Sequence, residues 1–180
     1  MRNWFFKKLL HNLESHTPEI LRHIQLQLLM NLTARAFQVP GKKIWCCPSD
    51  QALEAYARFT VACMEQTPAN PERLYRLSYA LGNKLRRLTG LKQPSDRQRL
   101  VFWLYRNIGI RMSGSLPGEI RVTECYFSRF YTPEQCRRID AMDAGIITGI
   151  CGGESLHFTR RITEGCDQCA ACLRKEKQDE

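Results

Sequence analysis

The sequence lacks the long apolar run that a membrane-spanning helix needs. Such a helix takes roughly 18 or more consecutive apolar residues, and Arg, Lys or Gln interrupts the lipophilic stretches of this 180-residue chain before that length. The first residues, MRNWFFKKLLHNLE, contain no uninterrupted apolar core of secretory length and no small-residue cleavage site. We therefore expect no signal peptide, and a cytoplasmic protein.

Acidic residues are also few. The chain has 18 Asp and Glu against 27 Lys and Arg, which gives a net charge of +9. This balance is compatible with nucleic acid, anionic lipid or an acidic protein as partner and does not choose among them. The contents of 43% hydrophobic and 25% charged residues are those of a globular protein and exclude a disordered chain.

Histidine is scarce and cysteine is abundant. The chain has four histidines and nine cysteines, and His11, His16 and His23 form no pair with metal-ligand spacing to a cysteine. An odd number of cysteines without a secretion signal argues against a disulfide framework. In a reducing cytosol these cysteines are expected to be metal ligands or reactive thiols.

Apolar periodicity predicts helices through most of the first 107 residues. The expected helices cover residues 2–14, a segment from Pro18 to Pro40, a segment opening at Pro48, and residues 71–89 and 95–107. Capping residues are expected at Thr17, at Asn70 and in a capping box formed by Ser95 and Gln98, with Gly90 ending the fourth helix. In the second helix an apolar stripe recurs at helical spacing: Ile20, Leu21, Ile24, Leu28 and Leu32.

The pattern then changes to alternation, which is typical of strands. Three strands are expected, at residues 108–113, 120–125 and 156–162, antiparallel because the first connection is too short for a helical crossover. A capping box at Thr132 and Gln135 starts a helix that Gly152 ends, and a Cys-rich turn follows the last strand. We expect an α+β fold, with residues 1–70 as a helical extension and residues 71–180 as a cysteine-rich α+β domain.

The sharpest local motif is Cys166-Asp-Gln-Cys169-Ala-Ala-Cys172. Cysteines at this spacing supply ligands to an iron–sulfur cluster, or occupy positions of a tetrahedral zinc site. A further ligand has to come from elsewhere. The candidates are Cys125, Cys136, Cys151 and Cys47, of which Cys136 and Cys125 are preferred. The alternatives are reactive thiols without metal, or thiols that behave as small buried hydrophobes.

A second motif lies on the last predicted helix. Cys136, Asp140 and Asp143 occupy positions i, i+4 and i+7 and so share one face. They are candidate metal ligands, or a catalytic group in which a thiol nucleophile works with a carboxylate base. The alternative is that the aspartates face solvent or pair with Arg137, Arg138 or Arg160.

A series of short motifs in the C-terminal half resembles a known family. They are Cys125-Tyr-Phe, Cys136-x3-Asp140, Gly145, Phe158-Thr-Arg160 and Glu164-Gly165-x-Asp167-x-Cys169, preceded by a helix with Gly82 at its centre. Their order resembles the L-2-amino-thiazoline-4-carboxylic acid hydrolase-like family and the related 4-vinyl reductase-like domains. The resemblance covers roughly residues 72–172.

This resemblance implies a sensor-like α/β fold with an enclosed pocket for a small organic ligand, and a Cys-bound zinc near it. Cys136 and Cys169 match recurring family cysteines, and Gly165 matches the preceding glycine. The chain departs from the pattern because residues 158–162 contain no Cys or Glu, while Cys166 and Cys172 are additional. All-thiolate ligation makes an iron–sulfur cluster credible. For a hydrolase, Cys136 would be the natural low-pKa nucleophile, with Asp140 or Asp143 orienting water.

Basic residues cluster between positions 73 and 106. They are Arg73, Arg76, Lys84, Arg86, Arg87, Lys92, Arg97, Arg99 and Arg106. On nucleic acid such a stripe would bind phosphates, with Trp103 and Tyr105 adding stacking, but no nucleic-acid-binding motif accompanies it. An acidic protein partner or a solvated face is favoured. The first helix, with Trp4 and Phe5 beside lysines, is expected to pack on the domain or a second subunit rather than on a membrane.

The sequence therefore predicts a cysteine-ligated metal or iron–sulfur protein that binds a small organic ligand. Its possible chemistry is redox, or that of a hydrolase or lyase acting on a small sulfur- or nitrogen-containing substrate. The alternative is a non-enzymatic, metal-stabilised module that senses a small molecule or docks a partner.

Overall fold

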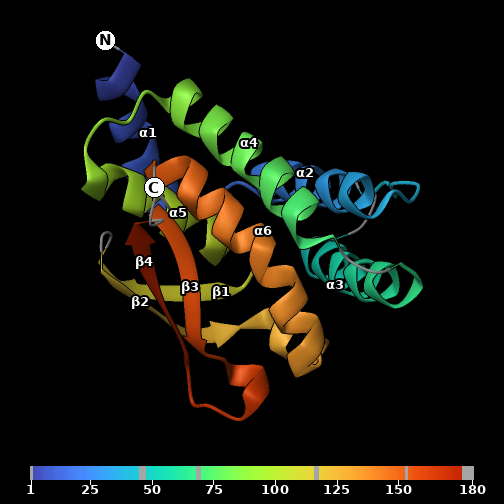
Figure 1. Ribbon diagram of the computed structural model, residues 1–180. Helices are drawn as coiled ribbons and strands as arrows, with labels where there is room; N and C mark the ends of the chain where they lie inside the picture. The colour runs from blue at the N-terminus through green and yellow to red at the C-terminus, as the bar shows by residue number, and fades with distance from the viewer. Residues whose placement is uncertain (1, 45–47, 68–69, 116–117, 153, 176–180) are drawn as a thin grey trace.

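Helices fill the N-terminal half of the molecule and a small sheet lies in the C-terminal half (Figure 1). The computed structural model describes residues 2–44, 48–67, 70–115, 118–152 and 154–175. The helices are α1 (Arg2–Ser15), α2 (Glu19–Phe37), α3 (Ser49–Gln66), α4 (Pro71–Thr89), α5 (Pro94–Asn107) and α6 (Pro133–Cys151). The strands are β1 (Ile110–Gly114), β2 (Glu119–Cys125), β3 (Glu154–Arg160) and β4 (Cys169–Lys175), with short 3-10 helices η1 (Tyr126–Arg129) and η2 (Ile162–Glu164). The predicted α+β class is confirmed.

The sheet is antiparallel, as expected, but it contains a strand that the sequence reading missed. The strand order is β1-β2-β4-β3, so β4 lies between β2 and β3. The segment predicted as a Cys-rich turn is therefore partly a central strand, which begins at Cys169. The expected third strand also ends earlier than predicted, because Ile162 begins η2.

Two of the predicted helix starts are confirmed and two are corrected. Asn70 caps α4, and Thr132 and Gln135 form the reciprocal capping box of α6. The box expected at Ser95 does not form, since α5 already begins at Pro94 with Gln93 as its cap residue. Thr17 does not cap α2 either: its hydroxyl donates to the Leu13 carbonyl oxygen at 2.9 Å.

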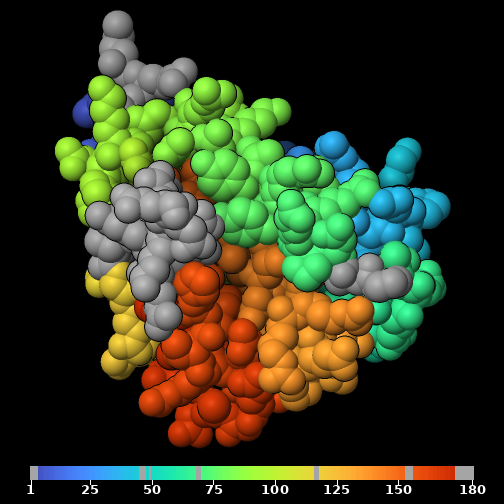
Figure 2. All heavy atoms as spheres, in the orientation of Figure 1, coloured from blue at the N-terminus to red at the C-terminus, as the bar shows by residue number. Residues whose placement is uncertain are grey.

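Helices α4 and α6 pack unusually closely, and they lie side by side in the ribbon view (Figure 1). The contact uses Gly82 on α4 and Gly145 and Gly149 on α6. A Cβ added to Gly149 would lie 2.5 Å from the Tyr79 carbonyl oxygen, and one added to Gly82 would lie 2.3 Å from that of Ile146. Only glycine permits this backbone approach, which sets where the inner face of α6 lies. On the surface, α4 crosses one face of the molecule above the exposed start of α6 (Figure 2).

Helices α2 and α3 pack against each other on the other side of α4. The inner side of α3 is buried, with Tyr56, Ala57 and Thr60 in the core. The stripe expected on α2 is placed differently. Ile20 and Leu28 are exposed, while Leu26 and Met30 are fully buried. Most of the predicted stripe, namely Ile20, Ile24 and Leu28, is therefore on the surface, whereas its last member, Leu32, is buried in the core.

Helix α1 lies against α5 and leaves part of its apolar side uncovered. Leu10 is buried, but Trp4 and Phe5 are exposed by 69% and 62%. In the described part of the chain, no helix is both long and apolar enough to cross a bilayer.

Candidate functional site

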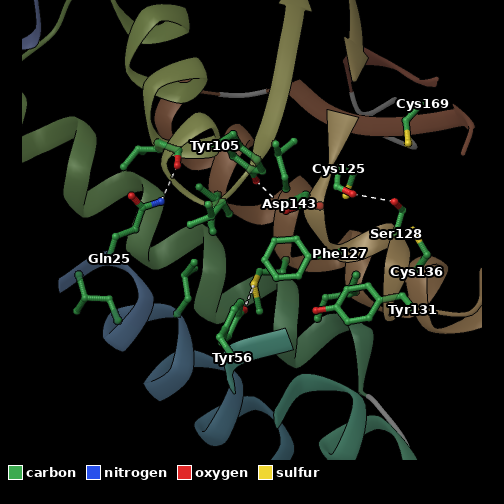
Figure 3. A pocket seen from close by; sticks show the side chains of 18 of the residues that line it. Gln25, Tyr56, Tyr105, Cys125, Phe127, Ser128, Tyr131, Cys136, Asp143 and Cys169 are labelled. Carbon is green, nitrogen blue, oxygen red and sulfur yellow. Dashed lines mark hydrogen bonds between the residues drawn. The ribbon is translucent and has the colours of Figure 1, made fainter. Parts of the chain in front are cut away.

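A cavity of about 240 Å³ lies between the helices and the inner face of the sheet. Its wall is assembled from helices α2 to α6, strands β1, β2 and β4, and the segments of η1 and η2 (Figure 3). Both halves of the chain contribute, so α2 and α3, which lie within residues 1–70, are part of this site. The cavity is the strongest candidate for a functional site in the described part of the chain.

The wall is mainly aliphatic and aromatic. Tyr56, Phe127 and Tyr131 line it and contact one another, with ring centroids 5.9 Å apart for Tyr56 and Phe127 and 5.6 Å for Phe127 and Tyr131. The aliphatic residues are Leu21, Ile24, Leu28, Leu29, Leu81, Leu85, Leu104, Ile108, Ile110, Ile139, Ile146 and Ile162. Such a lining favours an apolar ligand body.

The cavity reaches the surface beside α2. Ile24 and Leu28 both line it and remain exposed by 38% and 46%. Leu81 and Leu85 of α4, which are half-buried, line it as well. The entrance is therefore apolar. It is formed by Ile24 and Leu28 of α2 with Leu81 and Leu85 of α4.

Asp143, a predicted site residue, lies on the cavity wall. The Tyr105 hydroxyl of α5 donates a hydrogen bond to Asp143 Oδ1 at 2.8 Å (Figure 3). Burial raises the pKa of Asp143 from 3.8 to about 7, while the Tyr105 hydrogen bond acts to lower it and the charge of Asp140 to raise it. At neutral pH both the protonated and the ionised form of this carboxyl group are therefore populated.

Three predicted cysteines line the same cavity. Cys125, Cys136 and Cys169 lie toward one side of it (Figure 3). Burial raises the pKa of Cys125 to about 11 and that of Cys136 to about 12, and it also raises that of Cys169. The low-pKa thiolate expected at Cys136 is thus not favoured, because desolvation at this position disfavours the charged form.

Asp140 is held away from the cavity by an ion pair. Both Nε and Nη2 of Arg161 donate to Asp140 Oδ2, the former at 2.8 Å. Glu164 joins this group through Arg161 and Arg137. The pKa of Asp140 still rises to about 6, because burial outweighs the hydrogen bond and charge of Arg161. The ion-pair partner of Asp140 is therefore Arg161, and not Arg137, Arg138 or Arg160 as the sequence suggested.

The strand β4 separates the cysteines of the sharpest sequence motif. Val122 pairs with Cys169 and Ile120 with Ala171, so these residues share the buried face of the sheet. Cys172 pairs with Glu119, which is exposed, and therefore points to the opposite face. Cys166 lies before the strand, in a shallow depression with Arg160 and Asp167.

The structure does not bring Cys166, Cys169 and Cys172 together into one group. Within the described ranges, no three His, Cys, Asp or Glu side chains are grouped as a metal ion would require. Cys47, a candidate further ligand, lies outside the described residues. Binding of zinc or of an iron–sulfur cluster stays a prediction from the sequence.

Several of the clustered basic residues make contacts that connect helices within the protein. Arg97 donates to the Cys151 carbonyl oxygen at the end of α6, at 2.7 Å. Arg99 pairs with Glu14 of α1 at 2.5 Å, and Arg106 donates to the Glu14 carbonyl oxygen. These contacts hold α1 and α6 to α5, so the basic residues are not simply a free binding stripe.

The sequence reading missed the part that Tyr105 plays. The sequence suggests for Tyr105 only a stacking role on nucleic acid. In the structure Tyr105 is buried, and its hydroxyl donates to Asp143, which is 38 residues further along the chain. A tyrosine on the apolar side of a helix carries no local signal of its partner.

Comparison with known proteins adds no relative, since no family model, curated protein or solved structure matches this chain.

Proposed function

We propose that this protein binds one small, mainly apolar organic molecule in the cavity between α2, α4 and α6. The observation that carries the proposal is the cavity itself, about 240 Å³ in volume and lined largely by aliphatic and aromatic side chains. An apolar cavity of about 150 Å³ is enough to bind benzene in a protein interior. This one suits a single ring with a short substituent, or a branched chain of similar size.

The few polar groups on the wall support selective binding rather than simple packing. Gln25 is already used by the protein, since its amide donates to the Leu104 carbonyl oxygen at 2.7 Å. Asp143 lies on the same wall, beside the thiols of Cys125, Cys136 and Cys169, and its Oδ1 accepts the hydrogen bond of Tyr105. A mostly apolar wall with a few polar groups is typical of ligand sites.

The entrance offers a direct test with a matched control on one helix. Leu81→Trp places a large side chain where α4 lines the cavity, whereas Leu88→Trp places it on the exposed side of α4. The probes are uncharged benzene derivatives, ethylbenzene and 2-phenylethanol among them, with binding followed by the shift in thermal unfolding temperature and by calorimetry.

We expect at least one of these compounds to stabilise the wild-type protein and the Leu88→Trp variant but not Leu81→Trp. Equal stabilisation of both variants would place binding elsewhere and contradict the proposal. Absence of stabilisation by every compound of the set would contradict it as well.

A second candidate, hydrolysis in the same cavity, is supported by Asp143. A carboxyl group whose pKa is about 7 is suited to general acid or base work at neutral pH. Turnover of 2-amino-thiazoline-4-carboxylate by the wild type, abolished in Asp143→Asn, would support this reading. Unchanged turnover in the variant, or no turnover by the wild type, would exclude it for that substrate.

A further inference from the structure

The charge on the cavity wall is unbalanced. None of the lining residues that the structure describes is Lys, Arg or His, and Asp143 is the acidic residue among them. Asp140, one helical turn earlier, has Arg161 as its partner. Asp143 takes part in no ion pair with a described residue and has the neutral Tyr105 hydroxyl as its hydrogen-bond donor.

An unpaired carboxylate in such surroundings is costly to the fold. Transferring a charged group out of water without a partner is strongly unfavourable, while supplying the opposite charge recovers much of this cost. A ligand with a positive charge would therefore gain more here than an uncharged ligand of the same shape. The protein supplies the apolar surroundings and one anion, and a cationic ligand would supply the opposite charge.

The aromatic residues add a second, independent argument. Tyr56, Tyr105, Phe127 and Tyr131 all line the cavity together with Asp143. Aromatic rings attract organic cations through their negative faces, most strongly at desolvated sites. A carboxylate surrounded by aromatic rings is a suitable environment for an ammonium group.

We propose that the cavity binds an organic amine, whose ammonium group pairs with Asp143 while its apolar body lies against the aromatic and aliphatic wall. This inference rests on the proposed function and specifies its ligand class. The size of the cavity limits the amine to one carrying a single ring or a short alkyl chain.

The other titratable groups near Asp143 stay uncharged at neutral pH or are paired. They are Tyr56 on α3, Tyr105 on α5, Tyr131, Cys125 on β2, Cys136 on α6, Cys169 on β4 and Asp140 on α6. The pKa of each tyrosine and cysteine is raised by burial, and Asp140 is paired with Arg161. The protonation of Asp143 therefore controls the local charge.

Amine binding should then depend on pH with a definite sign. The ammonium group pairs with ionised Asp143, so a proton must leave this carboxyl group when binding occurs below its pKa of about 7. Amine affinity is expected to fall as the pH drops below that value, by up to about tenfold per pH unit. The affinity of an uncharged ligand should lack this dependence.

The experiment compares amines with alcohols of the same shape on the full chain. The probes are butylamine, cyclohexylamine, benzylamine and phenethylamine, each with its corresponding alcohol, measured by calorimetry at about pH 8 and about pH 5.5. The variants are Asp143→Asn, which keeps the side-chain shape, and Asp50→Asn, which makes the same charge change on the exposed start of α3.

We expect at least one amine to bind ten or more times tighter than its alcohol in the wild type and Asp50→Asn at the higher pH, by about 1.4 kcal/mol or more. This preference should disappear in Asp143→Asn and shrink at the lower pH. Alcohols that bind as tightly as the amines, with no effect of Asp143→Asn, would overturn the amine assignment and leave the proposed function standing. Absence of binding by every amine would overturn it too, and the uncharged probes then decide the function separately.

Discussion

The hydroxyl of Tyr105 on α5 donates a hydrogen bond of 2.8 Å to Asp143 on α6, and so joins these two helices inside the cavity. The bond favours the ionised carboxylate, yet burial outweighs it and the pKa of Asp143 still rises to about 7. Asp143 therefore carries a free-energy cost in the ionised state of the ligand-free fold. That cost is measurable through stability.

Replacing Asp143 by Asn should change how stability depends on pH. The folded-state pKa lies near 7 and the unfolded-state value near 3.8, so the wild type loses stability as the pH rises through this interval. The loss attributable to Asp143 is on the order of 2–4 kcal/mol. Asp143→Asn keeps an acceptor for Tyr105 and removes the ionisation, so its unfolding free energy should fall less between about pH 4 and about pH 8.

Urea denaturation across this pH range checks the expectation, with Asp50→Asn as the control for net charge. Asp140 contributes in the same direction, since burial raises its pKa to about 6. As the pH rises, the unfolding free energy of the wild type should therefore fall more steeply than the ionisation of Asp143 by itself would cause. A pH dependence that is identical in wild type and Asp143→Asn would contradict the buried-carboxyl description.

A methyl group at Gly149 should destabilise the fold strongly. Its Cβ would lie 2.5 Å from the Tyr79 carbonyl oxygen and 2.7 Å from the Asn83 nitrogen, both backbone atoms of α4. Forcing the helices apart should cost about 2–3 kcal/mol in unfolding free energy, which exceeds the gain in helix propensity of about 1 kcal/mol.

Gly41→Ala is the matched control, because the nearest atom to its added Cβ is 3.4 Å away. Chemical denaturation should find this variant within about 0.5 kcal/mol of the wild type. A Gly149→Ala variant equally close to the wild type would show that α4 and α6 have room to separate.

The thiol of Cys136 should react slowly with alkylating reagents. Burial raises its pKa to about 12, so the thiolate fraction at neutral pH is about 1000 times below that of an ordinary cysteine. Labelling with iodoacetamide, followed by peptide mass spectrometry, should modify Cys136 at least about ten times more slowly than a free cysteine peptide. Rapid labelling of native Cys136 would restore its candidacy as a nucleophile.

The cysteines on the two faces of β4 should differ in any metal dependence. If the purified protein contains zinc or iron, its content should fall in Cys169→Ser, because Cys169 lies beside Cys125 and Cys136 on the cavity wall. Cys172→Ser should keep the metal, since Cys172 lies on the opposite sheet face with Glu119. Elemental analysis, with circular dichroism to confirm folding, measures both variants.

If Cys172→Ser loses the metal while it stays folded, and Cys169→Ser keeps it, Cys172 is a metal ligand as the sequence motif predicts. The position of Cys172 on the opposite sheet face would then not be a guide to metal binding. A wild-type protein purified without oxygen and free of metal would instead show that the predicted metal centre is wrong.

Local signals predicted most of the helices and the class of the fold. Asn70 and the Thr132–Gln135 pair sit where their side chains bond the first turn of a helix, an interaction contained within a few residues. Such positions are readable without any knowledge of tertiary structure. The buried face of α3 that contains Tyr56 and Thr60 is equally local in origin, since its residues repeat with the helical period.

The strand β4 was missed because Cys169-Ala-Ala-Cys172 has little contrast between its two faces. Cysteine and alanine are both small and weakly apolar, so the alternation that marks a strand is faint, and the thiol spacing suggested a chelating turn. The stripe of Ile20, Ile24 and Leu28 was also ambiguous. Helical spacing identifies such a face but does not show whether a core or a cavity entrance lies beside it.

The candidate site itself was only partly predictable. Asp143 and Cys136 follow from helical spacing on α6, and both line the cavity. The partner Tyr105 and the rings of Phe127 and Tyr131 come from other elements, and their convergence depends on the tertiary fold. The pKa values raised by burial have the same origin, because desolvation depends on packing that no short motif encodes.

The position of β4 has a consequence for how the chain is made. Because residues 169–175 form a strand between β2 and β3, β3 has no partner in the sheet until these residues leave the ribosome. Cys169, which closes one side of the cavity, arrives at the same moment. During synthesis the nascent helices therefore have an unfinished apolar surface, and the cavity becomes competent for binding only when the last strand of the sheet inserts.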